Sequence, residues 1–335
     1  MPELPEVTAL AADLEKRLSG HVIDRLSVVA FAALKTFDPS PDALHDATIT
    51  GVSRHGKFLD IAAGELHLVI HLARAGWVRW RQGPPPAPTG RPSKGPLAAR
   101  LVLEDGSGLD ITEAGTKKSL SISVVRNPAE VPGIARLGPD PLDPAFTRDV
   151  FAAILAEQGR AQIKGVLRNQ SLIAGIGNAY SDEILHVAKM SPFKPAALTD
   201  DELDRLYAAV QSTLREALAR ADGLAASELK TEKKSGLRVH GRTGQPCPVC
   251  GDTIREVIFA DSTLQYCPTC QTSGKTTGGS RALPAAQVRV HQEPQHDAQH
   301  VIWRPLSRPP EGNRRLHPGW RRGFQTKSRL CLCES

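Results

Sequence analysis

The sequence predicts an α+β protein of several domains, in which a leading helix and a β-rich region are followed by a helical region and a small cysteine-bearing unit. Three observations predict this order. Short β-like runs fill residues 21–125, helical patterns dominate residues 149–220, and two Cys-x-x-Cys pairs lie within residues 236–275. The chain has 335 residues, of which 40% are hydrophobic, and this suffices for more than one core.

The first helix is predicted over residues 3–18. Pro5 falls in its first turn, where a missing N–H group has no cost. Apolar residues recur three or four positions apart and form one helical face: Leu4, Val7, Leu10, Leu14 and Leu18.

Seven β-like runs, separated by Gly, Pro, Asp and Ser, follow the helix. They are VIDRLSVV, KFLDIA, LHLVIHL, WVRWR, ARLVLE, LDIT and SLSISVV. This punctuation is typical of a sandwich or a barrel. The segment 83–96, GPPPAPTGRPSKGP, is too rich in Pro and Gly to pack, so we expect a surface loop there.

The pattern turns helical after a linker at 127–144. Helices are predicted over 149–158, 162–170, 178–188 and 201–220. We therefore expect domains at 1–130, 131–235 and 236–275, followed by a basic tail at 276–335 whose Pro-, Arg-, His- and Gln-rich composition favours disorder.

The net charge of +6 lies entirely in this tail. It holds ten Lys and Arg residues against four acidic residues, and residues 1–275 carry no net charge. Bulk charge therefore says nothing about nucleic-acid binding by the folded part. The tail is either a basic arm that adds non-specific DNA affinity or a passive extension.

No apolar run approaches the length of a membrane span, and the N-terminus has no signal-peptide pattern. We therefore expect a cytoplasmic protein without a membrane partner, whose six cysteines are metal ligands or free thiols rather than disulfides.

Four of these cysteines have the spacing of a zinc site. Cys247 and Cys250 form one Cys-x-x-Cys pair, and sixteen residues separate it from the second pair, Cys267 and Cys270. Four thiolates leave no open coordination position, so we expect Zn²⁺ in a structural role. The alternative is a set of redox or chance cysteines.

Three segments together resemble the formamidopyrimidine-DNA glycosylase and endonuclease VIII family. They are the start MPELPEV (1–7), the stretch IAGIGNAY (173–180) and the four-cysteine finger. The resemblance covers residues 1–275. It implies an N-terminal β-sandwich with flanking helices, a helix–two-turn–helix domain and a zinc-finger β-hairpin. It also implies base-excision repair of damaged double-stranded DNA, by a monomer, at the nucleoid of a bacterium.

The resemblance assigns the catalytic roles to Pro2 and Glu3. Removal of Met1 leaves Pro2 as a secondary amine, and an α-amino group titrates at roughly 7.7–8.0, so part of it is unprotonated near neutrality. Such an amine attacks C1′, expels the base and forms an iminium, after which β- and δ-elimination break the strand. Glu3 matches the family's general acid/base. The alternative for this segment is an ordinary helix start rich in acidic residues.

Further site residues follow from matching positions. Lys57 matches the catalytic-site lysine that reaches the phosphate beside the lesion, and Asn178 matches the phosphate-binding asparagine. Gly177 permits a tight turn whose N–H groups can face a phosphate. Lys164 is a weaker candidate for the DNA cleft. The alternatives are a solvated lysine at 57, a plain helix N-cap at 178 and a solvated helix face at 164.

The sequence departs from the family pattern at two DNA-contacting positions, the finger arginine and the wedge. Ser262 stands where the finger arginine is expected, so Arg255 or Lys275 would have to replace it. Arg74 stands at the wedge position, where it could stack or probe the opposite base. The segment 222–238 is short and basic compared with a lesion-capping loop. Two alternatives stay open: a lyase for abasic or cross-linked sites with little base excision, and a non-catalytic zinc protein that binds damaged DNA.

Overall fold

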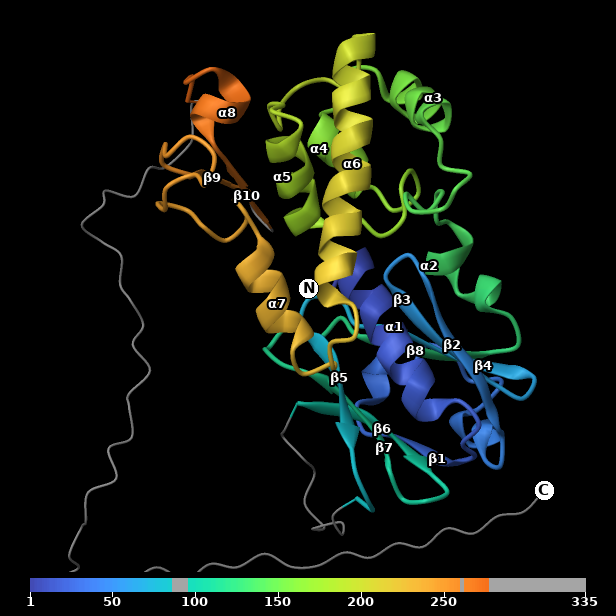
Figure 1. Cartoon of the computed structure of the whole chain (residues 1–335). Helices are drawn as coiled ribbons and strands as arrows, with labels where there is room; N and C mark the ends of the chain where they lie inside the picture. Colours follow the sequence, from blue (N-terminus) through green and yellow to red (C-terminus); the bar gives the residue numbers. More distant parts are fainter. Residues whose placement is uncertain (86–95, 260–261, 277–335) are drawn as a thin grey trace, which may run out of the picture. The chain divides into compact units, whose positions relative to one another are not determined.

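The computed structural model describes residues 1–85, 96–259 and 262–276, all of which belong to one compact unit spanning Met1–Gln287 (Figure 1). Most of the predicted loop at 83–96 and all but the first residue of the predicted tail at 276–335 lie outside the described residues. In the described part of the chain, no helix is long and apolar enough to cross a membrane.

The N-terminal region is a sandwich of two four-stranded antiparallel sheets. The sheet orders are β1-β6-β7-β5 and β2-β3-β4-β8. The strands are β1 (Ile23–Val28), β2 (Ile49–His55), β3 (Phe58–Ala63), β4 (Leu66–His71), β5 (Gly76–Arg81), β6 (Leu97–Leu103), β7 (Gly108–Glu113) and β8 (Ser121–Val125). Of the sandwich and barrel expected from the residues alone, the structure has the sandwich. Seven strands match the predicted runs, and β2 was not predicted.

Helix α1 (Leu4–Leu18) packs on the sandwich with the predicted apolar face. All five residues of that face are at most 1% exposed, and Leu10, Leu14 and Leu18 belong to the core of the sandwich. Three short helical turns complete this region: η1 (Phe31–Ala33), η2 (Pro41–Leu44) and η3 (Pro128–Glu130). Trp77 of β5 lies in this core, and Trp80 packs against it.

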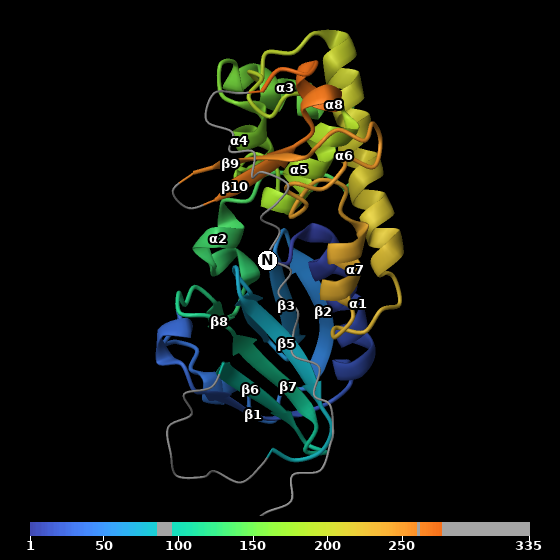
Figure 2. The same ribbon diagram turned by 90° about the vertical axis from the view of Figure 1, so that its left-hand side faces the viewer.

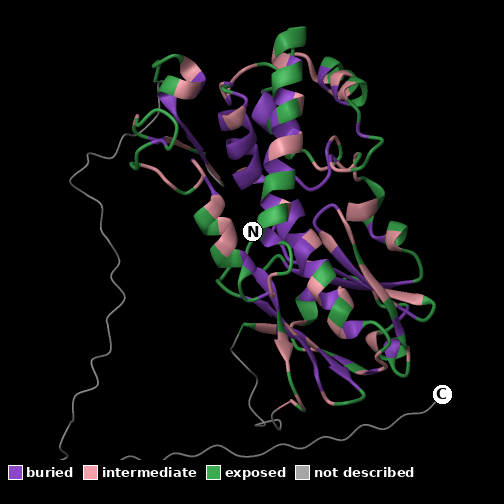
Figure 3. Cartoon of the chain, in the orientation of Figure 1, coloured by how far each residue is buried: buried purple, intermediate pink, exposed green. Residues whose placement is uncertain are grey.

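The second region is helical and has its own core, built around Phe151, Tyr180 and Leu206. Its helices are α2 (Pro132–Ala135), α3 (Arg148–Gln158), α4 (Ile163–Arg168), α5 (Asn178–Val187) and α6 (Asp200–Ala221). The last four match the predicted helices to within two residues at each end. Helix α5 is buried almost throughout and lies against α4 and α6 (Figure 3).

A short helix and the cysteine unit complete the described chain. Helix α7 (Leu229–Gly236) lies beside α1 and α6, near the N-terminus (Figure 1). The cysteine unit contains the hairpin β9 (Arg255–Ile258) and β10 (Thr263–Tyr266), followed by α8 (Pro268–Thr272). Strand β10 packs against α5, which joins the cysteine unit to the helical region (Figure 2).

Candidate active site

The chain is buried from Pro2 onward at the start of α1, whereas Met1 is 46% exposed. Glu3 is the N-cap residue of this helix, and its backbone N–H donates to Glu6 Oε2 at 2.8 Å. The Glu3 and Glu6 side chains are each only 2% exposed, and Pro2 is buried beside them. Two acidic side chains are therefore held in the interior next to the predicted nucleophile.

The Glu3 carboxylate is bound by the N-terminus of α5. It accepts hydrogen bonds from the backbone N–H groups of Gly177 at 2.6 Å, Ala179 at 3.0 Å and Tyr180 at 3.3 Å. A carboxylate at a helix N-terminus is stabilised by the unpaired N–H groups and the helix dipole. These N–H groups were expected to face a phosphate, but in the structure they hold Glu3.

These contacts decide the protonation of Glu3. Burial by itself would raise the pKa of this carboxyl group, but Lys233, Lys57 and the α5 N–H groups outweigh burial and hold the pKa below its ordinary value. Glu3 is therefore ionised near neutrality and ready to accept a proton.

Glu6 lies in the first turn of α1 and contacts side chains of α5 and α7. Its Oε1 accepts a hydrogen bond of 2.6 Å from the Tyr180 hydroxyl, and its Oε2 is 2.6 Å from Lys233 Nζ on α7. These contacts tie α1 to α5 and α7, so Glu6 orders the site.

The terminal amine titrates below its ordinary range. Burial lowers the pKa of the Met1 amine, and the positive charge of Lys233 lowers it further, whereas Glu3 and Glu6 act in the opposite direction. In the full-length chain this amine belongs to Met1. Removal of Met1 would transfer the terminus to Pro2, which is itself buried.

Lys57 follows Gly56, whose φ of 54° makes the predicted turn before β3. The Lys57 side chain is not solvated: the residue is 7% exposed, and its Nζ donates to the carbonyl of Ile176 at 2.8 Å. Burial is the main reason why the pKa of Lys57 falls to about 8, and Lys233 and Arg168 lower it further.

A cavity of about 1110 Å³ joins these groups to the helical region and the cysteine unit. Six of the predicted site residues line it: Pro2, Glu3, Lys57, Arg74, Gly177 and Asn178. Gly177, rather than Asn178, is the N-cap of α5. Asn178 Nδ2 donates to the Thr263 carbonyl at 2.7 Å, and its buried Oδ1 has no partner within the described part of the chain.

Lys164 is placed differently from both expectations. It does not line the cavity and is not on a solvated face, since it is only 5% exposed. Its Nζ is 2.6 Å from Asp182 Oδ1, 2.7 Å from Ser181 Oγ and 3.2 Å from the Asn178 carbonyl. A buried charge needs such a set of partners. Lys164 thereby connects α4 to the first turns of α5.

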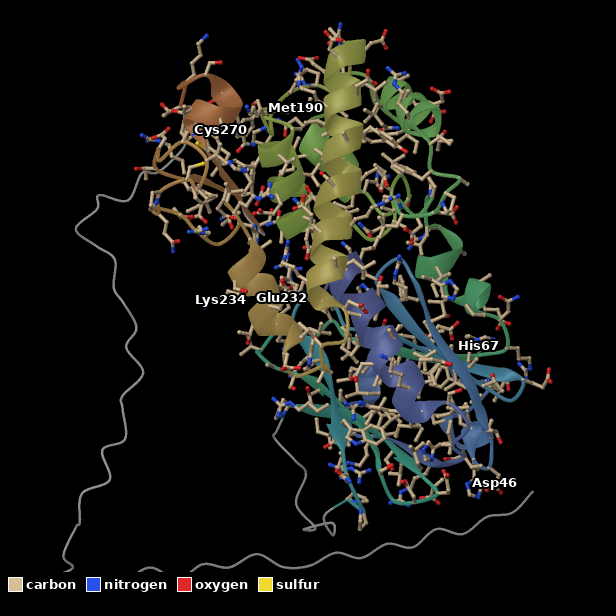
Figure 4. All side chains as sticks on the ribbon, viewed as in Figure 1. Asp46, His67, Met190, Glu232, Lys234 and Cys270 are labelled. Atoms are coloured by element: carbon tan, nitrogen blue, oxygen red, sulfur yellow. The ribbon has the colours of Figure 1, made fainter. Side chains whose placement is uncertain are left out.

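The four predicted zinc ligands meet in one place. The Sγ atoms of Cys247, Cys250, Cys267 and Cys270 all lie within 4.8 Å of one another. The Cys250–Cys267 and Cys247–Cys270 pairs are 3.3 and 3.9 Å apart. Tetrahedral Zn–S bonds of about 2.3 Å put sulfur atoms about 3.8 Å apart, so the cluster fits Zn²⁺. Figure 4 labels Cys270 in this unit.

Comparison with known proteins agrees with this geometry. The N-terminal domain model of formamidopyrimidine-DNA glycosylase matches residues 1–116, the H2TH domain model of the same enzyme matches 137–228, and the zinc finger found in FPG and IleRS matches 244–272. A formamidopyrimidine-DNA glycosylase from Symbiobacterium thermophilum is 35% identical over 307 residues, which cover 88% of this chain and 98% of that protein. The chain belongs to the formamidopyrimidine-DNA glycosylase family.

Two further relatives are informative. A formamidopyrimidine-DNA glycosylase-like protein of Mycobacterium tuberculosis, itself described as uncharacterized, is 55% identical over 154 residues, or 46% of this chain and 96% of that protein. The Lactococcus lactis Fpg in complex with DNA containing an abasic site superposes with a TM-score of 0.70 at 28% identity, over 80% of this chain and 99% of that chain. The family is one of DNA glycosylases, and membership places the chain in base-excision repair of damaged DNA, with structural zinc in its finger.

The positions that depart from the family pattern lie around the cavity. Ser262 and the exposed Arg74 both line it. Arg255, suggested as a replacement for the finger arginine, does not line it, and its Nε is buried without a partner among the described residues. Lys275 is exposed but does not line the cavity either.

Sequence reasoning missed the role of Lys233. It was noted only as part of a basic segment, and no pattern in residues 222–238 distinguishes it from its neighbours Lys230 and Lys234. Its spacing from the site in sequence is more than 220 residues, so only the tertiary structure shows that it reaches Glu6.

Proposed function

We propose that the protein is a bifunctional DNA glycosylase and abasic-site lyase that uses the Pro2 amine as its nucleophile. The observation that carries the proposal is a buried Pro2, beside a Met1 amine of lowered pKa, next to a buried, ionised Glu3 held by three N–H groups. A protein that only binds DNA needs neither group in that state.

The chemistry follows from these charges. The lone pair of Pro2 attacks C1′ of the damaged nucleotide, and the bond from C1′ to the base breaks with its electrons leaving on the base. The attack places a positive charge on the nitrogen, and Glu3 accepts the proton that the nitrogen sheds. Glu3 then returns a proton to the sugar ring oxygen as the ring opens to the iminium.

The iminium makes the C2′ hydrogens acidic. Loss of a C2′ proton expels the 3′ phosphate in β-elimination, and δ-elimination then expels the 5′ phosphate. Lys57, Asn178 and Arg74 line the same cavity and are the proposed contacts to DNA, in which the damaged nucleotide leaves the stack to reach Pro2.

The same proposal assigns regions of the chain to tasks. Residues 1–130 would carry the catalytic groups, 131–235 would bind double-stranded DNA, and the finger at 236–275 would close the third side of the cavity. We propose that the protein acts as a monomer at the bacterial nucleoid, as expected from the resemblance of its sequence to bacterial glycosylases.

A narrower activity is the second candidate. The altered positions Arg74 and Ser262 both line the cavity. They favour a lyase that acts on abasic or cross-linked sites with little base excision, since such substrates depend less on reading a damaged base. A panel of duplexes with damaged bases, compared with one duplex that holds a preformed abasic site, separates the two candidates.

Glu3→Gln tests the role of the carboxylate. Glutamine keeps an oxygen that accepts from α5 but can neither take nor return a proton, so we expect base removal to fall below detection while DNA affinity persists. Glu157→Gln, on the exposed face of α3, is the matched control. Turnover by Glu3→Gln at the wild-type rate would show that the assigned role is wrong.

A further inference from the structure

Helix α7 brings three lysines to the cavity, but only one of them is inserted into it. Lys230 and Lys234 are exposed, and Figure 4 labels Lys234 and its neighbour Glu232 on this helix. The side chain of Lys233 is 13% exposed and points to the start of α1. Withdrawing an ammonium group from water is costly unless charged or polar partners replace the lost hydration. Lys233 has four such partners.

The four partners all belong to the proposed catalytic centre. Lys233 Nζ is 2.6 Å from Glu6 Oε2, 3.8 Å from Glu3 Oε1 and 3.2 Å from the Met1 carbonyl oxygen. It also lies 4.6 Å from the centroid of the Tyr180 ring, in a cation–π contact.

The contact with Met1 locates the nucleophile. The carbonyl oxygen of a residue lies about 2.3 Å from the next backbone nitrogen, by standard peptide geometry. The Pro2 nitrogen is therefore within about 5.5 Å of Lys233 Nζ. At such a distance, in a buried site, one positive charge strongly disfavours a second.

The amine is faced by charges of both signs. At the Met1 amine, the terminus of the full-length chain, Glu3 and Glu6 favour the protonated form, and Lys233 and Lys230 on α7 oppose it. Lys57, from the β2–β3 turn, acts on Glu3 from the other side. Of the two α7 lysines, Lys233 has the larger effect on the amine. Without it, two buried carboxylates would face the amine with less opposing charge.

We propose that Lys233 is a positioning residue of the reaction, whose ammonium group pairs with Glu6 and Glu3 and keeps the Pro2 amine unprotonated near neutral pH. This inference rests on the proposed function and adds to it a pH-setting residue on α7. In this role Lys233 touches neither the sugar nor the base, and it acts through the charges of the amine and of the two carboxylates.

The test is the pH dependence of covalent trapping. The rate at which borohydride traps the enzyme on an abasic-site duplex is measured from pH 5.5 to 9, with DNA saturating, so that differences in affinity do not enter. We expect Lys233→Met to move the acid limb of this profile upward by about one pH unit, which lowers the rate at pH 6 about tenfold. Lys233→Arg, which keeps the charge, should restore most of the wild-type profile.

Lys16→Met is the matched control. Lys16 is exposed in the last turn of α1, about 20 Å along the helix from Glu3, and its loss removes the same charge without facing the amine. We expect the wild-type profile from it. Thermal unfolding of each variant confirms that the proteins compared are folded.

The outcomes distinguish a failure of the proposed function from a failure of the inference about Lys233. If the wild-type protein forms no trapped complex, the proposed function fails. If the wild-type protein is trapped and Lys233→Met shows the same acid limb, or if Lys16→Met shifts it equally, the inference about Lys233 is wrong and the proposed function stands.

Discussion

Lys57 is only 7% exposed, and burial lowers the pKa of its ammonium group to about 8. Below that pH the side chain is charged and able to pair with a phosphate, and above it the charge is lost. The free lysine would keep its charge to a pH above 10. The proposed DNA contact of Lys57 is therefore sensitive to pH in a range where an exposed lysine is not.

We predict that DNA affinity falls as the pH rises through 8, and that Lys57→Arg reduces this fall because arginine stays charged. The affinity for a duplex with an uncleavable abasic-site analogue is measured from pH 7 to 9.5, so that the DNA is not consumed and Glu3, whose charge raises the pKa of Lys57, stays in place. Both proteins keep the same terminal amine, so their difference isolates residue 57. Equal pH dependence of the two affinities would contradict the prediction.

The sequence predicts the role of some residues and not that of others. The four cysteines were predictable because the spacing of two turns determines the ligand set locally. Lys164 and Lys233 were not. A lysine in a helix of mixed composition looks solvated in sequence, and its burial depends on an acidic partner, Asp182 or Glu6, that only the tertiary fold supplies.

At the scale of elements, α5 connects the proposed chemistry to the finger. Its N-terminus holds Glu3, and Glu183 in its middle accepts three hydrogen bonds from the backbone of residues 238–240. In its last turn His186 Nε2 is 3.3 Å from Cys247 Sγ, the kind of contact that orients a zinc ligand. Displacing the start of α5 should therefore affect the proposed chemistry directly.

Gly177→Ala tests this connection. A Cβ at position 177 would lie 2.5 Å from Glu3 Cδ, too close for the carboxylate to stay in place. The φ of −124° is allowed for alanine, so the effect is steric. We predict a loss of strand cleavage of about a hundredfold in a folded protein, since a shift near 1 Å has such an effect.

Gly165→Ala is the matched control for that loss. Gly165 lies in α4 and is exposed, and no atom outside its own helix lies within 4 Å of the added Cβ. We expect unchanged cleavage and a gain in stability of about 0.5–1 kcal/mol. Cleavage is measured under single-turnover conditions, and stability is measured by thermal unfolding. Equal cleavage by the two variants would show that Glu3 tolerates displacement.

Strand β2 and helix α7 are among the elements that escaped sequence prediction, and both did so for a physical reason. Strand β2 has a burial pattern without alternation, because only Ile49 is buried while the other residues are exposed or half-buried. In α7 only Leu229 is buried. Periodicity reveals an element through its buried face, and neither element has a face that the pattern can reveal. The helices α1 and α6, with long buried faces, were predicted closely.

At the scale of the whole molecule, the described chain has separate cores for the sandwich, the helical region and the finger. The finger core is small and consists of Val239, Cys247, Ile254 and Cys267, with Cys270 packed against it. A core of this size does not fold without its metal. The Asn178–Thr263 hydrogen bond then depends on zinc, although Asn178 belongs to the helical region.

We predict that Cys250→Ser, or removal of zinc by a chelator, lowers DNA affinity at least tenfold while the sandwich stays folded. Cys331→Ser is the matched control, since Cys331 fits no ligand spacing. Affinity is measured by titration, folding of the sandwich by thermal unfolding, and recovery by re-addition of Zn²⁺ to the chelated protein. Full DNA affinity in the zinc-free protein would overturn this dependence.

The central claim is that Pro2 becomes the nucleophile. Borohydride trapping of the untagged protein on a duplex with one abasic site tests it most directly, beside Pro2→Gly and a form whose N-terminus is chemically blocked. We expect a covalent protein–DNA band from the untagged protein that is lost from the blocked form and diminished in Pro2→Gly, whose primary amine is a different nucleophile. The absence of a band from zinc-loaded, DNA-binding protein, or an equal band from the blocked form, would show that Pro2 is not the nucleophile.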